Sequence, residues 1–202
     1  MDTRRNARPP LRLARREGYV MGVQTQRVTV EQFMRFIALP QNADRLFEYI
    51  GGEIAEVVTN YRASLIAARI LGRMIAFVES KGLGYVSGEA GGYVVGEHRY
   101  LPDVAFISKS RQPVPPDAAY NPNPPDLAVE VLSPTDKPGR VRTKIASYLL
   151  AGTVVWVVDP DVKEVEVYTP GKAPETLGID VVVDGGDVLP GFTLPVKDVF
   201  QV

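Results

Sequence analysis

The sequence of 202 residues has no cysteine and only one histidine, His98. The absence of cysteine excludes disulfide scaffolds, thiolate zinc sites and cysteine nucleophiles. The single histidine excludes a multi-histidine metal site, and no G-x-S-x-G nucleophile elbow is present to support a serine hydrolase. Any chemistry must therefore rest on carboxylates, lysines, hydroxyls or a hard metal ion such as magnesium, which prefers oxygen ligands.

Long apolar segments and a bulk positive charge are also missing. No segment approaches the ~20 apolar residues of a membrane-spanning helix, and no secretory signal is recognisable, so we expect a cytoplasmic protein with no membrane partner. Residues 1–20 hold six arginines against Asp2 and Glu17. This leaves 17 of the 23 basic and 22 of the 24 acidic residues, a net charge of −5, for the rest of the chain. Such an acidic balance argues against tight binding of nucleic acid through bulk charge.

The arginine-rich start is expected to be separate from the folded part. We expect residues 1–27 to form a basic, disordered extension and residues 28–202 to form a single domain, because this length supports one hydrophobic core. Whether the extension contacts polyanions, and whether Met21 is the true start, stay open from the sequence.

Hydrophobic periodicity and turn residues predict alternating helices and strands. The predicted elements are helices at 29–38, 61–80 and 138–151, a hairpin at 45–58, and strands at 84–88, 92–96, 100–108, 126–133, 153–159 and 163–169. A proline-rich loop at 109–125 has the length of a functional or mobile segment, and short strands are expected over 175–200. The fold class is therefore α/β (α+β), with one β-sheet of mixed direction flanked by helices.

Two acidic residues lie next to apolar strand segments. Glu130 is in the middle of the strand segment Leu127–Leu132, and burying a carboxylate there without a partner would cost free energy. If Glu130 faced solvent instead, strand alternation would expose Ala128 and Leu132 as well. We therefore interpret Glu130 as functional. Asp103 alone could be a local turn or cap. If its strand neighbours that of Glu130, the two carboxylates repel unless a divalent cation or a shared proton intervenes.

Other charged residues are less decisive on their own. Lys144 lies in the helix that follows the Glu130 strand, where it could orient water or stabilise charge on a phosphate, or be an ordinary surface lysine. Glu48 and Glu53 flank the hairpin turn, and either could be a third metal ligand or a general base. The arginines of the 61–80 helix form a stripe that is more typical of a solvated border than of a DNA contact, and His98 is interpreted as structural or exposed.

At these residues the sequence resembles the Uma-type restriction endonucleases of the PD-(D/E)XK nuclease superfamily. The matching segments are RLFEYIGGEIAEV, YLPDVAFIS, PDLAVEVLSPTD, RTKIASYLLAGTVVWVVDPDVKEVEVY and LPGFTLPVKDVF, within about residues 29–200. The resemblance implies a restriction-endonuclease-like αβββαβ core. The literal signature is absent, because Leu132 occupies the usual lysine position; Lys144 matches a lysine on the following helix. Glu48 matches the family's early glutamate, which favours it over Glu53.

The resemblance implies a hydrolase, a magnesium- or manganese-dependent DNA endonuclease that cleaves phosphodiester bonds. Its catalytic residues would be Glu48, Asp103, Glu130 and Lys144, and the three acids would hold the metal. A homodimer acting on DNA is expected. Two alternatives stay open: a nuclease-fold binding or assembly protein with weak or no turnover, and a magnesium-dependent hydrolase of a smaller phosphodiester. No base-reading pattern predicts a DNA sequence specificity.

Overall fold

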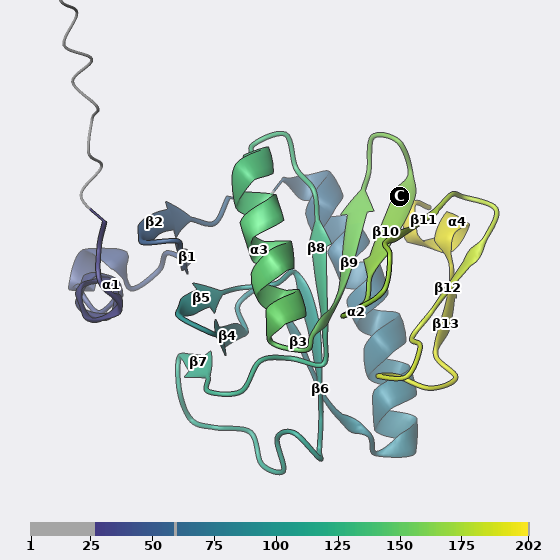
Figure 1. Cartoon of the computed structure of the whole chain (residues 1–202), viewed down its shortest axis with the longest axis horizontal. Coiled ribbons are helices and arrows are strands. Elements are labelled where there is room, and N and C mark those ends of the chain that lie inside the picture. The colour runs from purple at the N-terminus through teal and green to yellow at the C-terminus, as the bar shows by residue number, and fades with distance from the viewer. Residues whose placement is uncertain (1–26, 59, 202) are drawn as a thin grey trace, which may run out of the picture.

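A computed structural model describes residues 27–58 and 60–201 of the chain (Figure 1). The basic extension expected over residues 1–27 lies outside them, apart from Arg27. The helices are α1 (Val30–Ile37), α2 (Tyr61–Lys81), α3 (Pro138–Leu150) and α4 (Val196–Val199), with a short 3-10 turn at Pro40–Asn42. The strands are β1 (Phe47–Ile50), β2 (Glu53–Glu56), β3 (Gly84–Gly88), β4 (Gly92–Val95), β5 (His98–Tyr100), β6 (Val104–Ser108), β7 (Tyr120–Asn121), β8 (Leu127–Val131), β9 (Val154–Asp159), β10 (Glu164–Tyr168), β11 (Glu175–Leu177), β12 (Val182–Asp184) and β13 (Thr193–Pro195). Of the helices in these ranges, none combines the length and apolar character that crossing a membrane requires.

The described chain begins with a helix and a hairpin at the predicted places. The hydroxyl of Thr29 accepts a hydrogen bond from the Gln32 amide at 3.2 Å, and the Gln32 side chain accepts one from the Thr29 amide at 2.8 Å. This reciprocal capping satisfies two backbone amides and explains why α1 begins there. β1 and β2 then form the predicted hairpin, and Gly51 and Gly52 turn the chain with φ angles of 58° and 89°.

The larger sheet has the strand order β11-β10-β9-β8-β6-β3. β8 and β9 run parallel and are joined by α3, whereas the other neighbouring strands are antiparallel. β8 is apolar on both faces, with Val129 in the core on one side and Ala128 in the core on the other, which suits its central place. In chain order α2, β3, β6, β8, α3 and β9 form the expected αβββαβ core, so the predicted fold class is confirmed.

A second sheet of five strands was not expected. Its order is β2-β1-β5-β4-β7, so the first hairpin is extended by a hairpin from much later in the chain. The single strand predicted over 100–108 is wrong, because the chain leaves the smaller sheet after β5 and enters the larger one at β6. Pro102 lies in this connection and has no N–H to donate to a ladder. Asp103 consequently stands where the chain passes from one sheet to the other.

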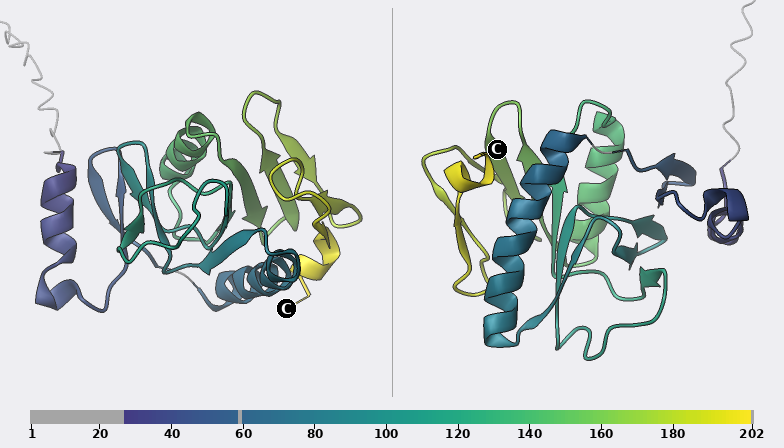
Figure 2. Two further views of the ribbon diagram at one scale, coloured as in Figure 1. Left: turned by 90° about the horizontal axis from the view of Figure 1, so that it is seen from below. Right: turned by 180° about the vertical axis from the view of Figure 1, so that it is seen from behind.

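α2 covers one face of the larger sheet, and α3 together with the smaller sheet covers the other (Figure 2). One core lies between the larger sheet, α2, α4 and the hairpin β12–β13, and it includes Ile66, Met74 and Trp156. The other core lies between the larger sheet, α3 and the smaller sheet, and it includes Tyr100 and Tyr148. The C-terminal part, expected as short strands, also contains α4.

The proline-rich loop at 109–125 is tied to the larger sheet and contains β7. The Nε atom of Arg111 lies 3.0 Å from Asp126 Oδ1, and its Nη1 atom donates a hydrogen bond to the Pro125 carbonyl at 3.0 Å. Asp126 Oδ2 also accepts a hydrogen bond from the Ser108 amide at 2.7 Å. Because Asp126 immediately precedes β8, these contacts fix the N-terminal end of the strand that carries Glu130.

Candidate active site

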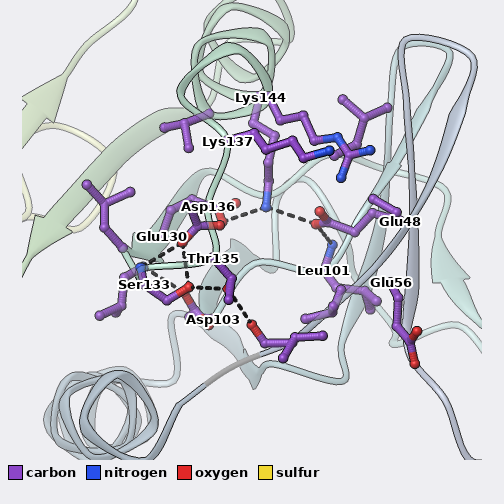
Figure 3. A pocket seen from close by; sticks show the side chains of 18 residues that line it. Glu48, Glu56, Leu101, Asp103, Glu130, Ser133, Thr135, Asp136, Lys137 and Lys144 are labelled. Carbon is purple, nitrogen blue, oxygen red and sulfur yellow. Dashed lines mark hydrogen bonds and ion pairs between the residues drawn. The ribbon is translucent and has the colours of Figure 1, made fainter.

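A cavity of about 280 Å³ lies between the first hairpin, the β8–α3 connection and the first turns of α3 (Figure 3). All four side chains singled out from the sequence line it: Glu48 from β1, Asp103 from the β5–β6 connection, Glu130 from β8 and Lys144 from α3. Residues far apart in the sequence thus converge because both sheets and α3 meet at this point.

Glu130 points from β8 toward α3 and is held on both carboxylate oxygens. Its Oε2 atom lies 2.5 Å from Lys144 Nζ, and its Oε1 atom accepts a hydrogen bond from the Tyr148 hydroxyl at 3.2 Å. Burial raises the pKa of Glu130 to about 8; Lys144 opposes the rise, and the neighbouring acids Glu48 and Asp103 reinforce it. The solvent-facing alternative for Glu130 is therefore wrong, since its side chain is only 13% exposed.

Lys144 links Glu130 to Glu48. Its Nζ atom donates to Glu48 Oε1 at 2.9 Å, and the same oxygen accepts a hydrogen bond from the Leu101 amide at 2.8 Å. Burial by itself lowers the pKa of Lys144, but the two glutamates outweigh burial and raise the pKa above its ordinary value. Lys144 is therefore a fixed cation, and the surface-lysine alternative is wrong, because the residue is buried.

Glu48 is buried because β1 has protein on both of its faces. Phe47 and Tyr49 pack in a cluster with Phe33 of α1, while Glu48 and Ile50 face the opposite way, into the cavity. Simple alternation in a two-stranded hairpin would have allowed Glu48 to face solvent. The second sheet and α3 remove that option.

Asp103 reaches the cavity from the β5–β6 connection. Its Oδ2 atom accepts a hydrogen bond from the amide of Val131, the residue after Glu130, at 2.6 Å. Burial raises the pKa of Asp103 to about 6, although the Val131 hydrogen bond and the charge of Lys144 act in the opposite direction. The Val131 bond therefore anchors Asp103 directly beside the strand position of Glu130.

The donor set fits a divalent cation in charge and in chemistry. Glu48, Asp103 and Glu130 carry three negative charges when ionised, and Lys144 supplies one positive charge, which leaves two negative charges in the cavity. Oxygen ligands of this kind suit magnesium. Among residues 27–58 and 60–201, however, no three acidic or histidine side chains already stand together as a preformed metal cage. Glu48 is turned instead toward Lys144.

The remaining candidates lie outside this arrangement. Glu53 is exposed and pairs with Arg140 at 3.0 Å, so the structure brings Glu48, and not Glu53, to Lys144. His98 accepts a hydrogen bond from the Gly51 amide at 3.1 Å and stacks on the Tyr100 ring, which fits its structural interpretation.

Two arginines of α2 pair with acidic side chains. Arg62 pairs with Asp161 at 3.0 Å, and Arg73 lies 3.8 Å from Asp198. These pairs are consistent with a solvated border of the helix, the interpretation favoured from the sequence.

Sequence reasoning missed three side chains at the site. Tyr148 holds Glu130 from outside the cavity lining, and its hydrogen bond to Glu130 depends on the packing of α3 on β8. Lys137 and Arg140 line the cavity. Their spacing of seven and four residues before Lys144 was the available signal, because it puts all three cations on one side of α3.

The chain matches the model of the Uma2 family, which is described as putative restriction endonuclease, over residues 30–197. The chain belongs to the Uma2 family. A crystal structure of a putative nuclease belonging to DUF820, from Anabaena variabilis ATCC 29413, is similar to this Uma2 protein with a TM-score of 0.75 and 26% sequence identity, covering 86% of this chain and 97% of the other. Curated proteins give no match. The matched Uma2 region contains Glu48, Asp103, Glu130 and Lys144.

Proposed function

We propose that this Uma2 protein is a metal-dependent DNA endonuclease that hydrolyses phosphodiester bonds. The observation that carries the proposal is the convergence of Glu48, Asp103, Glu130 and Lys144 in one cavity. With all three acids ionised, these four residues have two negative charges in excess. The raised pKa values of Asp103 and Glu130 are what carboxylates acquire in a desolvated, shared site.

Each residue has a role that follows from its contacts. Asp103 and Glu130 would hold Mg²⁺ or Mn²⁺, with Glu48 as the third acid. A bound divalent cation would supply charge neutralisation at the scissile phosphate and make a water molecule more acidic. Lys144 keeps its proton, so it does not serve as a general base; it orients Glu48 and Glu130 and offers positive charge to a phosphate.

DNA is proposed as the substrate because the family is described as restriction endonucleases. Lys137 and Arg140 line the cavity and would meet an approaching phosphate backbone. A homodimer is proposed on the general ground that symmetric dimers are the commonest oligomers, and in a dimer two sites would face the two strands. Analytical ultracentrifugation of the protein, alone and with a short duplex, tests the dimer.

A nuclease-fold binding or assembly protein is the second candidate. The ion pairs of Lys144 with Glu130 at 2.5 Å and Glu48 at 2.9 Å favour it, because they satisfy both carboxylates without a metal. A protein with this role would gain a specific buried network rather than a catalytic centre.

A calorimetric titration with Mg²⁺ and Mn²⁺ separates the two candidates. Wild type should bind, the double variant Asp103→Ala/Glu130→Ala should not, and Glu53→Ala, which removes an exposed acid, should bind like wild type. Cleavage of plasmid and oligonucleotide DNA is then compared with hydrolysis of bis(p-nitrophenyl) phosphate, which tests for a smaller phosphodiester substrate. A wild type that binds neither metal at millimolar concentration, even with DNA present, would refute the nuclease proposal and leave the binding protein.

A further inference from the structure

Glu130 is held at its two carboxylate oxygens by two different side chains of α3. Lys144 takes Oε2 and Tyr148 takes Oε1, one turn further along the helix. A glutamate side chain rotates about three bonds, and a single bond to Lys144 leaves its carboxylate plane free to turn. The second bond, on the other oxygen, removes that freedom.

Tyr148 is itself rigidly placed. Its side chain is fully buried, and its ring packs against that of Tyr100 with centroids 5.2 Å apart. Its carbonyl accepts a hydrogen bond from the Thr153 amide at 2.9 Å, so the end of α3 is fixed at this residue. Burial, reinforced by the charges of Glu130 and Glu48, raises the pKa of Tyr148 well above its ordinary value, so the hydroxyl remains a donor at neutral pH.

We propose that Tyr148 is a positioning residue for the reaction, whose hydroxyl holds the Glu130 carboxylate in the orientation that presents it to the cavity. The inference rests on the proposed function, since it assumes that Glu130 is a metal ligand. Without Tyr148, Lys144 alone would determine where Glu130 points, and Lys144 also attracts Glu48. Groups that orient a metal ligand from behind commonly change metal affinity by about 10- to 100-fold when removed.

The test compares Tyr148→Phe with Tyr100→Phe. Tyr100 is a matched control, because it is equally buried, belongs to the same ring pair, and donates its hydroxyl to Ser147 Oγ at 3.1 Å rather than to a carboxylate. Mn²⁺ affinity is measured by calorimetry, and kcat and KM are measured on DNA. Tyr148→Phe should bind Mn²⁺ about 10-fold or more weakly and lose kcat with KM for DNA unchanged, whereas Tyr100→Phe should stay within about twofold of wild type.

The rise in Tm at saturating Mn²⁺ is measured for each variant as well. It compares the metal-free and metal-bound forms of one variant, so it remains informative if Tyr148→Phe starts from a lower Tm. A smaller rise for Tyr148→Phe than for Tyr100→Phe supports the inference. Equal Mn²⁺ affinity in wild type and Tyr148→Phe, or equal losses in the two variants, overturns the inference alone. Wild type that binds no Mn²⁺ overturns the proposed function and this inference together.

Discussion

Replacing Glu130 by glutamine should make the metal-free protein more stable, and the gain should grow with pH. Glutamine keeps the shape of the side chain but carries no charge. Its amide oxygen can still accept a hydrogen bond from Lys144, and its amide nitrogen can donate one to the Tyr148 hydroxyl. The substitution therefore imitates the protonated form of Glu130, which burial favours. Lys144 and Glu48 are then left as a balanced pair at 2.9 Å.

The magnitude follows from the pKa of Glu130, which rises from 4.5 to about 8 on folding. Because the folded protein binds this proton more tightly than the unfolded chain, the corresponding stability is complete below pH 4.5 and is lost as pH rises through about 8. At about 1.4 kcal/mol per pKa unit, the free energy of unfolding of wild type is lower than at acid pH by about 1 kcal/mol at pH 5 and by about 4 kcal/mol at pH 8. Glu130→Gln should retain these amounts.

Urea unfolding in the presence of a chelator, at half-unit steps from pH 5 to pH 8, measures the difference. Glu56→Gln is the control, because the hydrogen bond from Arg45 lowers the pKa of that exposed glutamate and the expected effect has the opposite sign. If the difference between wild type and Glu130→Gln does not depend on pH, or if Glu130→Gln is the less stable protein at pH 8, the reasoning from burial is refuted.

Three further predictions concern the surrounding residues. The free energy of unfolding of Asp103→Asn should exceed that of wild type by about 3 kcal/mol at pH 7, and most of this difference should develop between pH 4 and 6, because burial raises the pKa of Asp103 from 3.8 to about 6. The same urea series measures this difference. The free energy of unfolding of Lys144→Met should be about 3–5 kcal/mol lower than that of wild type at pH 8 and should fall by less at pH 5, where Glu130 can take up a proton. A decrease that is equal at both pH values would contradict this. The free energy of unfolding of Arg111→Ala, measured by thermal unfolding, should be about 2–3 kcal/mol lower than that of wild type, because the bonds of Arg111 to Asp126 and to two carbonyls are lost. Mn²⁺ binding should not be weakened.

The elements that local sequence patterns determine were predictable. The capping pair before α1, the glycine turn of the first hairpin and the apolar strand around Glu130 each depend on residues within a few positions of one another. Glu130 could be chosen for the same reason, because a charged residue within an apolar segment is visible without any tertiary contact. Lys144 lies in an amphipathic helix and could be singled out only through the family resemblance.

The two-sheet arrangement could not be predicted, because it depends on pairing between distant segments. Tyr49 pairs with Arg99, 50 positions later, and nothing in either segment specifies the other. An apolar stretch such as 100–108 also does not reveal that its two ends belong to different sheets. Consequently the burial of Glu48, and its contact with the Leu101 amide, were out of reach of sequence patterns alone.

The same charges that make the cavity suitable for a cation make the metal-free fold less stable. Asp103 and Glu130 both have raised pKa values, so at pH 8 the folded protein bears the repulsion of carboxylates that a single Lys144 cannot neutralise. A bound Mn²⁺ and the Glu130→Gln substitution would relieve this repulsion in different ways, one by adding positive charge and the other by removing negative charge. Their stabilising effects should therefore not add: at one fixed Mn²⁺ concentration, the Tm at pH 8 should rise more for wild type than for Glu130→Gln, which has lost one charged ligand. Equal rises in both proteins would mean that the cation binds elsewhere.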